Sequence, residues 1–281
     1  MNFIYWFVST GWLYLMICIG IFLTIWLAIH WKRYNWQNRL GTLAIIVLCF
    51  HVMEEWVFPG GFHFIYNLNA DNPLDSSSNY PMSQLTDMIT NLGGAIIGMM
   101  VFFIWGLNDG AGIAIAIFSL FEAVIHVFLA SKSLSAFRPY GQTSFYAPGL
   151  ITALGMFLPI FIAYLINFIF RKKKPSWKAW VGGIASLGVL SFLLVNLPEM
   201  LLKSEDSPFA FTSHGYYDQF INGTYQTGMT GGTIAAIIVL SLLVAALISI
   251  CIYYFAIKKR KWSDLTNYFR RINNPEETKK E

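Results

Sequence analysis

The sequence predicts an all-α, polytopic membrane protein: a bundle of about seven transmembrane helices, with the N-terminus outside and the C-terminus in the cytoplasm. Only 12% of the 281 residues are charged, whereas 56% are hydrophobic and 17% are aromatic. Soluble proteins carry about 25% charged residues. Apolar runs of the length that crosses a bilayer, about 20 residues, recur along the whole chain. The composition therefore excludes an ordinary soluble domain.

Seven apolar segments have the length of a spanning helix. They cover residues 6–30, 41–58, 83–106, 110–131, 148–170, 179–202 and 231–257. The chain then divides into a first helix with its cytoplasmic connection, a core of four helices, two further helices with a long outer loop, and a tail. These parts are residues 1–40, 41–170, 171–257 and 258–281. In the tail, Trp262, Leu265 and Phe269 recur at helical spacing beside arginines, which predicts an amphipathic helix on the inner membrane surface.

The distribution of lysine and arginine predicts the orientation. The connection between the first two spans holds three of them, the connection between spans five and six holds five, and the tail holds eight, together 16 of the 19. Cytoplasmic loops carry such an excess. The N-terminus is therefore expected outside. The same clusters lie between apolar runs, so the net charge of +4 indicates membrane lipids as partners and no nucleic acid.

The three predicted outer connections are long and rich in aromatic residues. They cover residues 59–82, 132–147 and 203–230. Two interpretations are open at this point. The aromatic side chains either form the interfacial belt that is common in membrane proteins or fold into a cap over a cavity.

The most unusual stretch of the chain is a histidine with two carboxylates inside the second predicted span. On a helix, Glu54 and Glu55 lie about 60° and 40° to either side of His51, so all three share one face. Ionisable groups at this depth cost at least about 2.5 kcal/mol each, and they usually face a bundle interior or a cavity. We therefore interpret these residues as the core of a functional site.

Other predicted spans place polar residues at a matching depth. Two pairs have the i, i+4 spacing that puts both members on one helix face, and a third pair lies near the outer end of span six. They are Glu122 with His126, Asp87 with Asn91, and Asn196 with Glu199. Their common level predicts that these groups meet in the folded bundle.

The residue types at this level suggest a metal centre. Imidazole and carboxylate are ligands of zinc and of iron. His51, His126 and Glu122 are the candidate ligands of a divalent metal, zinc first and iron as an option, with Glu54 or Glu55 as catalytic base or as a further ligand. The remaining residues are candidates for supporting or substrate-binding positions: Asp87, Asn91, Asn196 and Glu199. Two alternatives stay open. One is a metal-free site for proton transfer or ligand binding, and the other is a network that only fixes helix packing.

Several motifs of the chain resemble one known family. The stretches HVMEEW and FPGGF at residues 51–62, EAVIH at 122–126 and YAPGLITA at 146–153 are similar to bacterial membrane proteins named for an H-x-x-E-E motif. The resemblance covers about residues 41–170. It implies His51, Glu54, Glu55 and His126 as signature positions, and it implies no established reaction. Glu122 departs from the family pattern, in which a neutral residue such as asparagine is expected.

Three functions are compatible with these features. The first is an intramembrane, metal-dependent enzyme, most simply a hydrolase, acting on a lipid or lipid-linked substrate from the outer leaflet of a bacterial plasma membrane. The second is a proton- or cation-coupled transporter or ligand-binding membrane protein that uses the same histidines and glutamates. The third is a structural accessory subunit whose polar cluster packs against a partner. Span seven contains no lysine, which argues against a retinal-binding protein.

Overall fold

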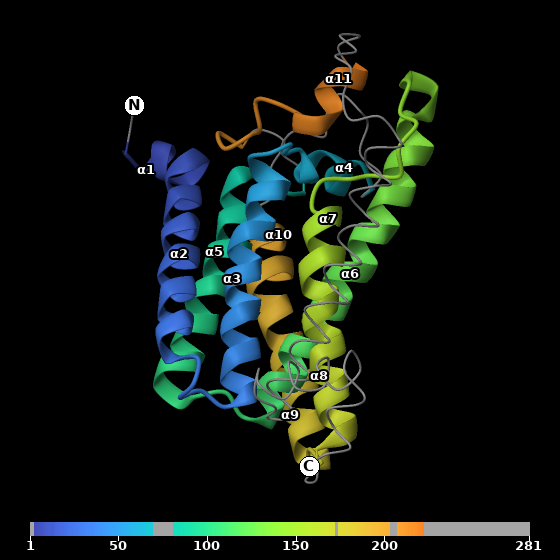
Figure 1. Cartoon of the computed structure of the whole chain (residues 1–281). Coiled ribbons are helices and arrows are strands. Elements are labelled where there is room, and N and C mark those ends of the chain that lie inside the picture. The colour runs from blue at the N-terminus through green and yellow to red at the C-terminus, as the bar shows by residue number, and fades with distance from the viewer. Residues whose placement is uncertain (1–2, 70–80, 172–173, 203–206, 222–281) are drawn as a thin grey trace, which may run out of the picture.

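The computed structural model is an upright bundle of helices, described for residues 3–69, 81–171, 174–202 and 207–221 (Figure 1). Every regular element in this described part is helical, which confirms the all-α class. The predicted seventh span at residues 231–257 and the amphipathic tail at 258–281 lie outside the described residues. The count of seven spans and the orientation of the termini therefore stay predictions.

Among the described residues, five continuous helices are long and apolar enough to cross a membrane. They cover Phe3–His30, Gln84–Ile104, Asp109–Tyr140, Leu150–Phe170 and Trp177–Leu202. Their α-helical parts are α1 (Phe3–Trp6) with α2 (Trp12–His30), α5 (Gln84–Met100), α6 (Asp109–Phe137), α7 (Leu150–Thr152) with α8 (Leu158–Phe170), and α9 (Trp177–Ser191) with α10 (Leu197–Leu202). These helices coincide with five of the predicted spans, and they identify the chain as a membrane protein.

Four of these helices contain a five-residue π-helical turn. The turns cover Phe7–Gly11, Val101–Trp105, Ala153–Phe157 and Phe192–Asn196. Such turns occur mostly as single insertions in α-helices and often lie at functional sites. The turn at Ala153–Phe157 directly follows α7, the short helix that takes part in the site described below.

The second predicted span is helix α3 (Trp36–Trp56), which is central to the bundle although it is more polar than its neighbours (Figure 1). Asn35 caps its first turn by accepting a hydrogen bond from the backbone N–H of Asn38 at 2.8 Å. Polar residues at both ends keep α3 out of the group of five apolar helices. The helix nevertheless packs against α2 and α5 on one side and against α6 and α8 on the other.

Two apolar clusters hold α3 in this place. The first joins it to α2 and α5 through Met16, Leu23, Cys49, Val52 and Ala95. The second joins it to α6 and α8 through Leu40, Ala44, Ile113, Phe157 and Tyr164. Helices in a membrane associate through close side-chain packing, because lipid tails are as apolar as leucine. The two clusters therefore bury opposite faces of α3 and fix which of its residues face α6.

One end of the bundle is covered by a folded layer, here called the cap. It consists of residues 58–69, which include α4 (Phe62–Asn69), residues 138–149, and residues 207–221, which include α11 (Asp218–Ile221) (Figure 1). Its aromatic side chains Phe64, Tyr146, Tyr217 and Phe220 pack with one another and with Phe137 at the end of α6. In the described residues, the aromatic loops therefore form a folded cap, the second of the two interpretations.

The glycines after α3 allow this cap to close. Gly61 has a φ of +98°, and a Cβ at this position would overlap the backbone carbonyl of His214. The carbonyl of Gly60 accepts a hydrogen bond of 3.0 Å from the N–H of Tyr216. Only a residue without a side chain allows two backbones to approach so closely. The Pro-Gly-Gly break thus docks residues 213–217 onto the end of α3.

Candidate functional site

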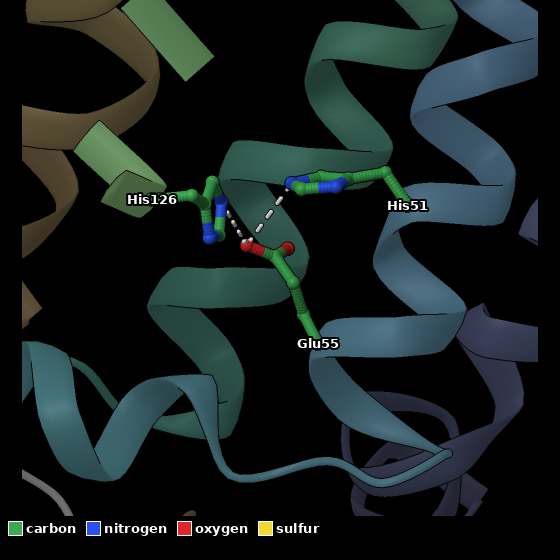
Figure 2. A group of neighbouring side chains, drawn as sticks. All are labelled: His51, Glu55 and His126. Carbon is green, nitrogen blue, oxygen red and sulfur yellow. Dashed lines mark ion pairs between the residues drawn. The ribbon is translucent and has the colours of Figure 1, made fainter. Parts of the chain in front are cut away.

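Two histidines and two glutamates meet between α3 and α6. Figure 2 shows His51 and Glu55 of α3 facing His126 of α6. Oε1 of Glu55 lies 3.2 Å from Nε2 of His51 and 3.2 Å from Nε2 of His126. Oε2 of Glu122 lies 3.6 Å and 3.5 Å from the same two nitrogens. Residues 67 to 75 positions apart in the sequence, on the two helices, are thereby brought to one point in the membrane region.

These four groups converge without pairing through hydrogen bonds. Nε2 of His51 and both ring nitrogens of His126 are buried and have no hydrogen-bond partner among the described residues. The two imidazole rings lie perpendicular to each other with centroids 4.7 Å apart. In tetrahedral zinc sites with bonds of about 2.0 Å, neighbouring ligand atoms are about 3.3 Å apart. The observed separations of 3.2 Å match that spacing. His51, Glu55 and His126 therefore form a buried group that could hold a metal ion.

Glu54, the other half of the carboxylate pair, points to a different set of partners. Its Oε1 accepts hydrogen bonds from the Tyr146 hydroxyl at 3.0 Å and from the Ile151 N–H at 3.1 Å. Its Oε2 accepts from the N–H and from the hydroxyl of Thr152 at 2.8 and 2.6 Å. Four donors on one carboxylate hold it in a fixed position at the start of α7. Glu54 thus anchors the loop before α7 to α3.

Thr152 connects Glu54 to His51. Its hydroxyl oxygen lies 2.6 Å from Nδ1 of His51. Because the single hydroxyl proton is donated to Glu54, the oxygen accepts from His51, and Nδ1 of His51 carries the ring proton. This assignment follows from the hydrogen-bond network. It leaves a lone pair on Nε2 that faces Glu55 and His126, and such a buried partner on the second ring nitrogen is what orients metal-binding histidines.

Gly149 makes room for His126. Its φ is +91°, and a Cβ there would overlap the imidazole ring of His126. The loop before α7 therefore lies directly against the ring at a position that favours glycine for two reasons, its conformation and its lack of a side chain. Tyr146, Ala147 and Leu150 around it are fully buried. This stretch of loop forms one wall of the site.

The other predicted positions are not among the four converging groups, although Asp87 interacts electrostatically with Glu55. Asp87 and Asn91 share a buried face of α5, and the Asn91 amide donates to Oδ1 of Asp87 at 2.6 Å. Asn196 is exposed on the π-helical turn between α9 and α10. Glu199 contacts Tyr66 of α4 instead. The structure thus brings together His51, Glu55, Glu122 and His126, places Glu54 immediately behind them, and puts Asp87 with Asn91 at the neighbouring end of α5.

Three residues of the site were not predicted as functional from the sequence: Tyr146, Gly149 and Thr152. They belong to a loop and a short helix whose contacts with α3 depend on the tertiary fold. One signal was present, because a Pro-Gly break followed by threonine begins the fifth predicted span and interrupts its apolar pattern. A polar residue in the first helical turn after such a break is a candidate to support an intramembrane site.

The fold and the site define a helical membrane protein with a buried two-histidine, two-glutamate centre. Within that class, residues 42–164 match the family model described as a protein of unknown function with an HXXEE motif. The match spans somewhat less than half of the chain and confirms the resemblance over that stretch. It contains all four converging residues and also Glu54 and Thr152. The curated proteins and the solved structures that were compared gave no match.

Proposed function

We propose that the protein is an intramembrane, metal-dependent hydrolase that acts on a lipid or lipid-linked substrate from the outer leaflet. In this proposal His51, His126 and Glu55 bind a divalent metal ion, zinc or, as the second choice, iron. The observation that carries the proposal is the convergence of two buried, unpaired Nε2 atoms on one carboxylate oxygen at 3.2 Å. A network that only fixed helix packing would direct hydrogen-bond donors at acceptors, whereas these ion-pair distances come without a hydrogen bond at either Nε2 atom.

The ligand set fits such a metal chemically. Two neutral imidazoles and one carboxylate leave room for a water or substrate oxygen, which is the arrangement of catalytic zinc sites. The bound ion would lower the pKa of its water and polarise a substrate oxygen. Glu122 is the most accessible of the four side chains, with 16% exposure against 5% or less for the others. Glu122 therefore suits the role of proton acceptor or of a fourth, exchangeable ligand.

The location of the site supports a substrate that comes from the bilayer. Glu122 lies in α6, and its neighbours Phe121 and Val124 are 58% and 59% exposed on a helix apolar enough to span the membrane. Such side chains face lipid. Basic residues of the described chain gather at the end opposite the cap, including Lys32, Arg33 and Arg171. By the positive-inside rule this distribution supports an outward-facing cap, as the proposal requires.

Elemental analysis of the detergent-purified protein tests the proposal. We expect about one equivalent of zinc or iron in the wild type, and background levels in His51→Ala, His126→Ala and Glu55→Gln. The matched control is His214→Ala, which removes a histidine of the cap and should keep the metal. Circular dichroism and size-exclusion chromatography of each variant separate metal loss from unfolding. A folded wild-type protein that binds no divalent metal, even when metal is added during purification, would overturn the proposal.

A further inference from the structure

A second polar feature lies beneath the cap, beside the histidine and glutamate centre. It is a cavity of about 220 Å³ between α2, the end of α3, the start of α5 and residues 211–215 of the cap. Its walls include Trp12, Trp56, His63, Gln84, Asp87 and Phe211. Pockets for drug-sized ligands measure about 300–1,000 Å³. This cavity is therefore suited to a small group, such as the head group of a lipid.

Two unpaired hydrogen-bond acceptors belong to residues that line the cavity. Asp87 is 1% exposed, and only its Oδ1 is bonded, by Asn91. Its Oδ2 and the Oε1 of Gln84 are buried and have no partner among the described residues. No lysine or arginine is among the described residues that line the cavity. Buried carboxylates are normally paired with a cation or with donors, because an unpaired one is costly.

Aromatic rings complete the walls. The rings of Trp56, His63 and Phe211 lie against one another, with centroid distances of 5.5 Å for Trp56–His63, 3.6 Å for His63–Phe211 and 4.8 Å for Trp56–Phe211. Trp12 adds a fully buried ring from α2. Aromatic faces attract cations, and tryptophan does so most strongly. Nε1 of Trp56 is a buried donor without a partner in the described chain. The cavity thus combines a free carboxylate oxygen, an amide oxygen, aromatic rings and one indole donor.

We propose that this cavity binds a primary ammonium group, specifically that of an aminoethyl phosphate head group. Asp87 Oδ2 and Gln84 Oε1 accept N–H donors from the ammonium, and the Trp56 indole donates to the neighbouring phosphate ester. A quaternary ammonium has no N–H and leaves both acceptors unpaired, so the cavity selects against choline. Since Trp56 directly follows Glu55, the head group lies at the same end of α3 as the candidate metal centre. This head-group proposal does not depend on a metal ion bound at the neighbouring centre.

Lipid retention tests this inference on the full chain. The wild type and variants are exposed to nanodiscs containing phosphatidylethanolamine and phosphatidylcholine in equal amounts, and the lipid that remains bound after purification is quantified by mass spectrometry. We expect about tenfold enrichment of phosphatidylethanolamine by the wild type, since a hydrogen bond to a charged group contributes about that factor or more. Asp87→Asn should reduce the enrichment to near onefold. Asp109→Asn, which changes a carboxylate at the end of the bundle opposite the cap, should keep it.

Two further measurements sharpen the outcome. Gln84→Met keeps the side-chain length and removes one acceptor, so it should lower the enrichment of phosphatidylethanolamine at least threefold. If Asp87→Asn does not fold, the Gln84→Met result tests the proposal in its place.

Direct binding of free phosphoethanolamine distinguishes a soluble ligand from a lipid. Enrichment of the lipid, or binding of the free head group that is lost in Asp87→Asn, supports the proposal. Equal retention of both lipids with no binding of the free head group would overturn it. Gln84→Met, which leaves the Asp87 carboxylate beside Glu55 unchanged, should keep the metal content of the wild type, so the two proposals fail independently.

Discussion

Two polar clusters lie at different levels of the bundle and differ in how their charges are matched. Near the end opposite the cap, Arg171 donates two hydrogen bonds to the two oxygens of Asp109, at 2.8 and 2.6 Å, and Gln37 donates to the same carboxylate. Between α3 and α6, by contrast, two imidazoles and two carboxylates approach one point with unpaired nitrogens. The first arrangement joins α3, α6 and the end of α8 and has a structural role. The second could hold a metal ion.

The largest effect is expected from Gly149→Ala. A methyl group there would overlap the His126 ring, and the φ of +91° is unfavourable for alanine by about 1–2 kcal/mol. The variant should lose its metal and unfold at a lower temperature, as measured by elemental analysis and thermal melting. Gly182→Ala is the matched control, because a Cβ at that glycine meets nothing within 4 Å. Full metal content in Gly149→Ala would contradict the tight fit of loop and imidazole.

Thr152→Val should act more mildly and more specifically. Valine has the shape of threonine but cannot connect His51 to Glu54, so the preferred ring tautomer and orientation of His51 are lost. Removal of such a supporting partner weakens metal binding about 10- to 100-fold. Competition with a chelator measures the change. Thr24→Val, which removes a hydroxyl bonded only to Gly20 O of its own helix, should bind metal like the wild type. Unchanged affinity in Thr152→Val would show that the threonine does not orient the histidine.

Arg171→Met tests the structural role of the cluster formed by Arg171 and Asp109. It removes the bidentate ion pair with Asp109, whose side chain is 34% exposed, so solvent screening reduces the effect. We expect a loss of about 1 kcal/mol in stability, seen as a lower thermal midpoint, with the metal content unchanged. If metal binding fell as well, the two clusters would be coupled through α3 and α6, and the division into a structural and a functional cluster would be wrong.

The smallest effect concerns His63 in the cap. Burial lowers the pKa of His63 well below its usual value, with a further contribution from His214. The folded protein therefore keeps His63 neutral while the unfolded chain binds a proton below about pH 6.5. The contribution of His63 to stability is complete above that pH and is lost as the pH falls. Between pH 7.5 and pH 6 the loss is about 0.8 kcal/mol. His63→Phe keeps the ring stack, so its thermal midpoint should depend less on pH than that of the wild type. An identical pH dependence in both proteins would contradict the neutral state.

The helical class and the pairing of His51, Glu55, Glu122 and His126 were predictable because helical periodicity and depth in the bilayer both follow from residue spacing. It was not predictable that Glu54 and Glu55 would contact different partners. Adjacent residues on a helix point about 100° apart. Which of the two carboxylates accepts hydrogen bonds from the loop before α7 and from α7 itself depends on where that loop lies in the folded bundle. The aromatic cap likewise depends on contacts between residues 62–64 and 211–217, which are far apart in the sequence. Asn196 was grouped with the site by depth alone, and depth does not give the direction in which a side chain points.

The polarity of α3 has a consequence for how the chain enters its membrane. Ionisable residues in a spanning helix raise the free energy of its insertion, and α3 carries two glutamates and a histidine in its last two turns. The preceding helix, Phe3–His30, has a mean hydropathy of 2.4 and is joined to α3 by a turn of a few residues. We expect α2 and α3 to insert together as a hairpin, with α2 supplying the apolar surface that α3 lacks. Helix α3 then becomes stable in the bilayer only when α6 and α7 have closed around its carboxylates.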